Sequence, residues 1–147
     1  MIYKVCENTV VLRLEKGEEI LSSIKKVCEA EDIKLGTISG LGAVDYLSVG
    51  LYKTKEKEYI SNVYQGEFEI SSLIGNVTTK NSKVYLHIHA TFSDVKNKVV
   101  GGHLNKAIVS ATAEIFILKV KGTVERELDD TIGLNLMKFQ VKKIQSQ

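Results

Sequence analysis

The three histidines of this chain lie within one short segment of the sequence. His87 and His89 are separated by a single residue, and His103 follows a Gly-Gly pair. Apolar and polar residues alternate over residues 84–93, which is typical of a strand with one buried face. Successive side chains of a strand point to opposite faces, so His87 and His89 project from the same side.

A polar segment, residues 94–98, is typical of a hairpin loop and determines where the third histidine lies. The expected register pairs Ser93 with Val99, Thr91 with Gly101, His89 with His103 and His87 with Asn105. Directly opposite residues of an antiparallel pair have Cβ atoms about 4.5–5.5 Å apart, so the three imidazoles converge on one patch. A bulge at the two glycines would instead turn His103 to the other face.

Three neutral imidazoles at this spacing could bind a divalent transition metal, and zinc first of all. Zinc accepts tetrahedral nitrogen ligands at about 2.0–2.1 Å and keeps a fourth position for water. We therefore expect His87, His89 and His103 to be metal ligands. The alternative is a polar sheet face whose histidines form hydrogen bonds with their neighbours or with solvent.

Two carboxylates are candidates to assist such a site, although no residue is assigned a catalytic role. Asp94 follows the His-x-His strand, and Glu114 interrupts an apolar run. Either could act as an acid–base group or as a partner of the histidines. For Glu114 we favour a structural ion pair with Arg126, because a buried carboxylate needs a partner.

The segments around the histidines predict an α+β fold, a mainly antiparallel sheet with one principal helix. Apolar residues recur three and four positions apart over residues 17–31, which predicts the helix. The expected strands are residues 2–6, 10–14, 33–39, 44–52, 58–64, 68–79, 84–93, 99–104, 108–120 and 123–127. Residues 134–139 close the domain. The strand over 108–120 is apolar on both faces, so we expect it to be covered on both sides. The single helix can cover only part of the sheet, and we expect oligomerisation to cover the rest.

Length and composition favour one globular domain over residues 1–147, with its core at about residues 3–136 and a tail at about 141–147. The 147 residues carry a net charge of +2, and no apolar run is long enough to cross a membrane. We therefore expect a cytoplasmic protein with no membrane partner, and Cys6 and Cys28 as reduced, buried thiols. The segment 39–43 (SGLGA) is more typical of a turn than of a phosphate-binding loop.

Three motifs taken together resemble one known family. They are residues 66–77 (GEFEISSLIGNV), 86–90 (LHIHA) and 99–104 (VVGGHL). This combination is similar to the PPC (plants and prokaryotes conserved) domain, which occurs alone in prokaryotes and after AT-hooks in plant nuclear proteins. The resemblance covers about residues 3–136. It implies a homotrimer, DNA binding and a metal site on the three histidines. No AT-hook is present in this chain.

These observations support three functional hypotheses. The first is a homotrimeric DNA-binding or regulatory module with a three-histidine zinc site, in which DNA binding follows from the resemblance. The second is a metal-dependent enzyme with a zinc-activated water, which requires a concave pocket at the histidines. The third is a protein-interaction scaffold. A non-enzymatic role is favoured, since the charge pattern and motifs contain no independent catalytic signature.

Overall fold

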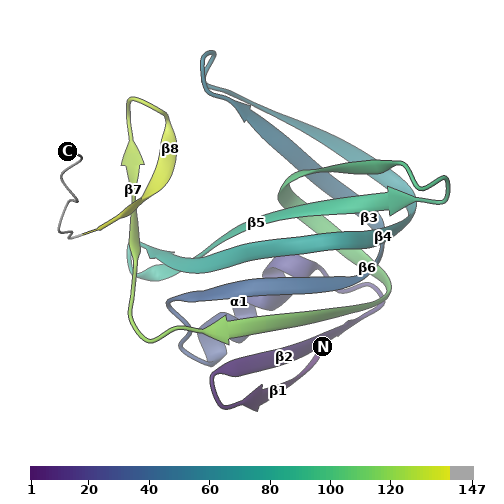
Figure 1. The fold of residues 1–147 in the computed structure, drawn as a ribbon, viewed down its shortest axis with the longest axis horizontal. Helices are drawn as coiled ribbons and strands as arrows, with labels where there is room; N and C mark the ends of the chain where they lie inside the picture. Colours follow the sequence, from purple (N-terminus) through teal and green to yellow (C-terminus); the bar gives the residue numbers. More distant parts are fainter. Residues whose placement is uncertain (140–147) are drawn as a thin grey trace, which may run out of the picture.

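The computed structural model describes residues 1–139, which form one continuous sheet and one helix (Figure 1). The predicted tail at 141–147 lies outside the described residues. The elements in chain order are β1 (Ile2–Cys6), β2 (Thr9–Glu15), α1 (Ile20–Ala30), β3 (Gly36–Lys53), β4 (Glu58–Lys80), β5 (Lys83–Asp94), β6 (Val99–Lys119), β7 (Glu125–Asp129) and β8 (Leu134–Lys138). The expectation of a mainly antiparallel sheet with one helix is confirmed.

Four strands form a closed circuit of backbone pairing. β3 pairs with β4, β4 with β5, β5 with β6, and β6 again with β3. The C-terminal part of β6 also pairs with β2, and β1 completes that edge. The histidine strand β5 is therefore held on both edges, by β4 and by β6.

The predicted separation into many short strands is wrong, because three strands are much longer than expected. The segment 39–43, expected to be a turn, lies inside β3, where the register shifts between Gly40 and Gly42. Further register shifts bend β3 and β4 without ending them. A β-bulge leaves one residue unpaired and increases the local twist, so these strands curve while their backbone pairing continues.

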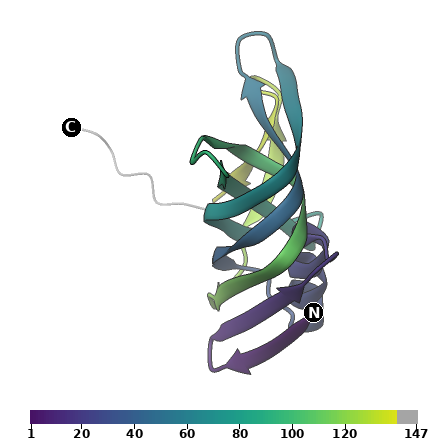
Figure 2. The ribbon, with the colours of Figure 1, turned by 90° about the vertical axis from the view of Figure 1, so that its right-hand side faces the viewer.

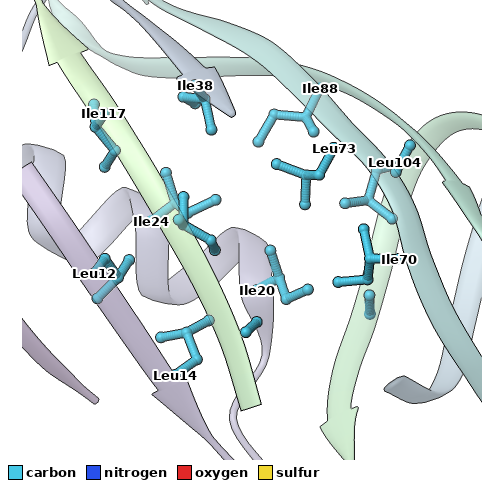
Figure 3. Packing of buried hydrophobic residues seen from close by; sticks show 14 of the residues in the cluster. Leu12, Leu14, Ile20, Ile24, Ile38, Ile70, Leu73, Ile88, Leu104 and Ile117 are labelled. Carbon is cyan, nitrogen blue, oxygen red and sulfur yellow. The ribbon is translucent and has the colours of Figure 1, made fainter. Parts of the chain in front are cut away.

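The core lies between α1 and one face of the sheet (Figures 2 and 3). Ile20 and Ile24 of the helix are fully buried in the same hydrophobic cluster as Leu12 of β2 and Ile117 of β6. The helix begins at the predicted region, with the carboxylate of Glu19 accepting hydrogen bonds from the first backbone N–H groups. This capping contact satisfies donors that have no partner within the helix.

The opposite face of the sheet is apolar but uncovered in the single chain. Its large exposed side chains are Leu41, Ile74, Phe116 and Leu118, of which Phe116 is 47% exposed. They come from β3, β4 and β6 and lie on the side of the sheet away from α1. The helix covers one face of the sheet, and the expected cover of the other face by oligomerisation stays a prediction. We call these four residues the apolar face.

Two smaller expectations concern the cysteines and the membrane. Cys28 is buried as predicted, and burial raises the pKa of its thiol to about 12. Cys6 is exposed, contrary to prediction, because β1 is an edge strand that pairs only with β2. Among residues 1–139, no helix has the length and apolar character needed to cross a membrane.

Candidate metal centre

The register of β5 and β6 is the one that the sequence predicts. Ser93 pairs with Val99, and His89 lies directly opposite His103. The ladder between these two strands ends at this pair, so His87 has no partner on β6 and the predicted pairing with Asn105 does not form. On its other side, His87 lies opposite Asn76 of β4.

The two glycines before His103 allow three backbones to approach closely. A Cβ atom at Gly101 would lie 2.6 Å from the carbonyl oxygen of Ala90 on β5. A Cβ atom at Gly102, whose φ is +152°, would lie 2.6 Å from the carbonyl oxygen of Gly50 on β3. The pairing register passes through both glycines without a shift. Close packing, and not a bulge, therefore explains the Gly-Gly pair.

The three imidazole rings converge on a common centre. Their nearest nitrogen atoms all lie within 4.8 Å of one another, and the Nε2 atoms of His87 and His89 are 3.2 Å apart. Ring centroids are separated by 5.1 to 5.5 Å. Tetrahedral zinc with metal–nitrogen distances near 2.05 Å holds its ligand nitrogens about 3.3 Å apart. This donor set therefore fits a transition metal after small ring rotations.

The surroundings favour neutral imidazole rings, which is the state that binds metal. Burial is the main cause that lowers the pKa of His87 to about 4, and electrostatic repulsion of its protonated form by His103, Arg126 and His89 lowers it further. Burial also lowers the pKa of His103, with a smaller contribution from His89. At neutral pH both of these rings are therefore uncharged and available as ligands.

A cavity of about 450 Å³ opens beside two of the histidines. His87 and His89 form one side of it, and residues of β3 and β4 form the rest. These are Thr37, Ile38, Ile74, Gly75 and Asn76. The cavity thus combines two isoleucines with an amide and a hydroxyl group, and its lining includes no carboxylate.

Arg126 of β7 anchors the β7–β8 hairpin next to this cavity. Its guanidinium donates hydrogen bonds to the Oγ1 of Thr78 at 2.8 Å, to the Oδ1 of Asn76 at 3.0 Å and to the backbone carbonyl of Asn135 at 2.8 Å. The guanidinium carbon also lies 4.9 Å from the ring centroid of Tyr85. Through Asn76, the β7–β8 hairpin is therefore connected to the residue opposite His87.

The proposed partners of the histidines lie elsewhere. Glu114 is exposed, and its cross-strand neighbours are Arg13 on β2 and Leu41 on β3. The expectation of a buried Glu114 paired with Arg126 is wrong, because β6 carries Glu114 on its uncovered face and Arg126 bonds to neutral acceptors on β4 and β8.

Asp94 is also distant from the metal ligands. It lies five residues beyond His89, about 16 Å along a strand, and on the alternate face. Its carboxylate accepts hydrogen bonds from the backbone N–H groups of Lys96 and Lys98, which lower the pKa of Asp94. Asp94 thus stabilises the β5–β6 loop, and an acid–base role at the histidines does not fit this position.

Sequence reasoning did not place three residues next to the histidines, although it named one of them, Arg126, as a partner of Glu114. Asn76 and Arg126 are described above, and the ring of Tyr59 meets that of His103 edge-on at 6.2 Å while its hydroxyl donates to Asn105. Two signals were available in the sequence. Asn76 is a polar residue within an apolar strand, and Arg126 is one of only two arginines.

Comparisons with known proteins agree with this geometry. Residues 1–121 match the family model of the Plants and Prokaryotes Conserved (PCC) domain. A metal-containing protein from Archaeoglobus fulgidus is 34% identical, with a TM-score of 0.85 over 94% of this chain and 97% of its own. A plant- and prokaryote-conserved (PPC) protein from Pyrococcus horikoshii is 32% identical, with a TM-score of 0.85 over 96% and 97%.

A third solved structure, from Bacteroides thetaiotaomicron, is called a "putative dna binding protein". It is 28% identical to this chain, with a TM-score of 0.92 over 95% of this chain and 98% of its own. The comparison with curated proteins finds no match. The family model covers most of the chain and includes the His-x-His strand and the Gly-Gly-His motif. The chain therefore belongs to the plants-and-prokaryotes-conserved domain family.

Proposed function

We propose that the protein binds one divalent transition metal ion per chain through His87, His89 and His103, and that zinc is the preferred metal. The observation that carries this proposal is the convergence of three imidazole nitrogens within 4.8 Å of one another. Nitrogen ligands suit zinc, copper, iron and nickel better than they suit magnesium or calcium. The relative from Archaeoglobus fulgidus, named as metal-containing, supports the same interpretation.

The cavity beside the histidines supports a ligand-binding or regulatory role for this metal. When bound, zinc supplies Lewis acidity to a group in its open position. Acid–base catalysis requires a titratable group within reach of the reacting atoms, and neither Asp94 nor Glu114 lies at the cavity. Recognition of a ligand therefore fits this environment better than hydrolysis.

Elemental analysis tests the metal proposal. The protein is purified without an affinity tag, and its metal content is compared with that of the H103Q variant. We expect about one zinc per wild-type chain and a large reduction in H103Q, with circular dichroism confirming that the variant is folded. The proposal fails if wild-type protein carries no metal and also does not bind added Zn²⁺ in a titration.

We propose further that the protein assembles as a homotrimer through the apolar face. Monomeric soluble proteins rarely expose large contiguous apolar patches. Phe116 of β6 and Ile74 of β4 both pair with Ser39 of β3, so they lie on the same exposed surface, together with Leu41 and Leu118. Burial of this face against copies of itself would remove it from water. Native mass spectrometry should give the mass of three chains, and a monomer at micromolar concentration would contradict the assembly.

A second candidate function is DNA binding, supported by the name of the Bacteroides thetaiotaomicron relative. The exposed lysines at the tip of the β3–β4 hairpin, Lys53, Lys55 and Lys57, are candidates for contacts with phosphates. Such binding weakens steeply as salt increases, because contacts with phosphates release counterions. Filter binding at a series of salt concentrations should show this fall in DNA affinity, and the K53A/K55A variant should make its dependence on salt shallower. Absence of retention at low ionic strength would exclude this function.

A further inference from the structure

Arg126 is a buried cation that has only neutral partners. Arg126 is 7% exposed, and all three of its hydrogen-bond acceptors are uncharged. No carboxylate among residues 1–139 forms an ion pair with it. Buried charges are normally paired, because removing an ion from water costs several kcal/mol. The positive charge next to the cavity is therefore uncompensated within the described chain.

The hydrogen bond from Arg126 determines the orientation of the Asn76 amide. A guanidinium group can only donate, so the group of Asn76 that faces it at 3.0 Å must be the carbonyl oxygen Oδ1. The amide nitrogen Nδ2 then lies on the other side of the Asn76 amide. No described residue accepts a hydrogen bond from it, and Asn76 is part of the cavity lining opposite His87. The two N–H groups of the Asn76 amide thus have no acceptor among the described residues.

The remaining lining of the cavity favours one chemical class of ligand. Its two isoleucines offer apolar contact, and one of them, Ile74, also belongs to the apolar face, so the cavity lies at the edge of the proposed trimer interface. Thr37 offers a hydroxyl group, and the lining contains no acidic residue that would oppose the positive potential of Arg126. A small organic carboxylate matches this combination, because its oxygens accept hydrogen bonds and its charge is attracted by the cation. Its volume of about 450 Å³ accommodates a small molecule, one side of which would stay in contact with solvent because the cavity is wide open.

We propose that this cavity binds a small carboxylate beside the metal ion, with Asn76 donating a hydrogen bond to a carboxylate oxygen and Arg126 holding the Asn76 amide in the donating orientation. This inference rests on the proposed metal site. Asn76 is a ligand-positioning residue here, and Arg126 acts through it without contacting the ligand.

Cobalt-substituted protein allows metal binding and carboxylate binding to be measured separately. Co²⁺ is first titrated into metal-free protein and followed by visible absorption. Acetate is then titrated into the Co²⁺ protein at constant ionic strength, and its effect on the same absorption bands gives its dissociation constant. The comparison uses wild type, N76D and N76A, with N8D as the control. N8D makes the same change of charge in the exposed β1–β2 turn, outside the residues that line the cavity.

The N76D variant separates a donor role of Asn76 from a structural one. Aspartate has the shape of asparagine and keeps an oxygen facing Arg126, but it has no N–H donor and adds a negative charge. We expect N76D to remain folded and to bind Co²⁺, while its affinity for acetate falls at least 10-fold. N76A should also lose affinity, and N8D should match wild type.

Each outcome of this experiment is decisive. If wild-type protein does not bind Co²⁺, the metal proposal and the carboxylate inference are both overturned. If wild type binds Co²⁺ but acetate does not change its spectrum, or if N76D binds acetate as tightly as wild type, only the carboxylate inference is overturned. If N76D loses Co²⁺ binding, acetate affinity is compared between N76A and wild type instead, and equal affinities overturn the carboxylate inference.

Discussion

Acidification of the metal-free protein tests the environment of His87. Burial, with smaller contributions from His103, Arg126 and His89, lowers the pKa of this ring from its ordinary value of 6.5 to about 4. Between these two values the unfolded chain binds a proton that the folded protein excludes. Stability is therefore complete above about pH 6.5 and is lost as the pH falls towards 4.

The size of this loss follows from the same pKa values. Each pKa unit corresponds to about 1.36 kcal/mol, so if the ring were fully removed from water, the free energy of unfolding would fall by about 3 kcal/mol between pH 6.5 and pH 4. His87 is only partly buried, and solvent screening reduces the effect. We expect a contribution of about 1–2 kcal/mol to the free energy of unfolding.

Urea denaturation with a chelator present measures this contribution, at one fixed protein concentration and between pH 7 and pH 4.5. Other groups also titrate in this range, so the relevant quantity is the difference between wild type and H87Q. The acid-induced loss should be about 1–2 kcal/mol smaller in H87Q. H89Q, which replaces the exposed histidine of the same strand, should keep most of the wild-type loss. Equal losses in wild type and H87Q would refute the argument from burial.

Three substitutions test the packing around the site. Gly102→Ala places a Cβ 2.6 Å from the Gly50 carbonyl oxygen at a φ of +152°. The free energy of unfolding, measured by urea denaturation, should therefore fall by about 3 kcal/mol, and Zn²⁺ affinity, measured by titration, should fall with it. Unchanged stability would disprove the close packing. Ile24→Ala removes a fully buried side chain and should cost about 2–5 kcal/mol in urea denaturation while leaving Zn²⁺ affinity unchanged. Phe116→Glu adds a charge to the apolar face, so native mass spectrometry should find a folded monomer, and an intact trimer would exclude this face as the interface.

The histidine patch could be predicted because its determinants are local. Alternation in β5 places His87 and His89 on one face, and the short loop after Ser93 sets the register that brings His103 opposite His89. Both rules operate over a few residues, since side-chain direction has a period of two and a hairpin loop fixes the pairing that follows it. The helix was predictable for the same reason, from the spacing of its buried residues.

The partners of the histidines could not be predicted in this way. Glu114 looked like a buried acid because its neighbours in the chain are apolar, but the uncovered face on which it lies is decided by the pairing of β6 with β2 and β3. The length of β3 and β6 was missed because a β-bulge and a turn have similar sequence signals, and only the partner strands show that pairing continues through the bend.

The sequence by itself determined the three histidines of the candidate site, their common face, the position of the helix and the family. Tertiary structure alone decided which groups surround these histidines. Arg126 reaches Asn76 across 50 residues of chain, and the cavity has walls from β3, β4 and β5. Local periodicity fixes the direction in which a side chain points, whereas the contacts that orient an amide or bury a cation depend on strands that meet only when the sheet closes.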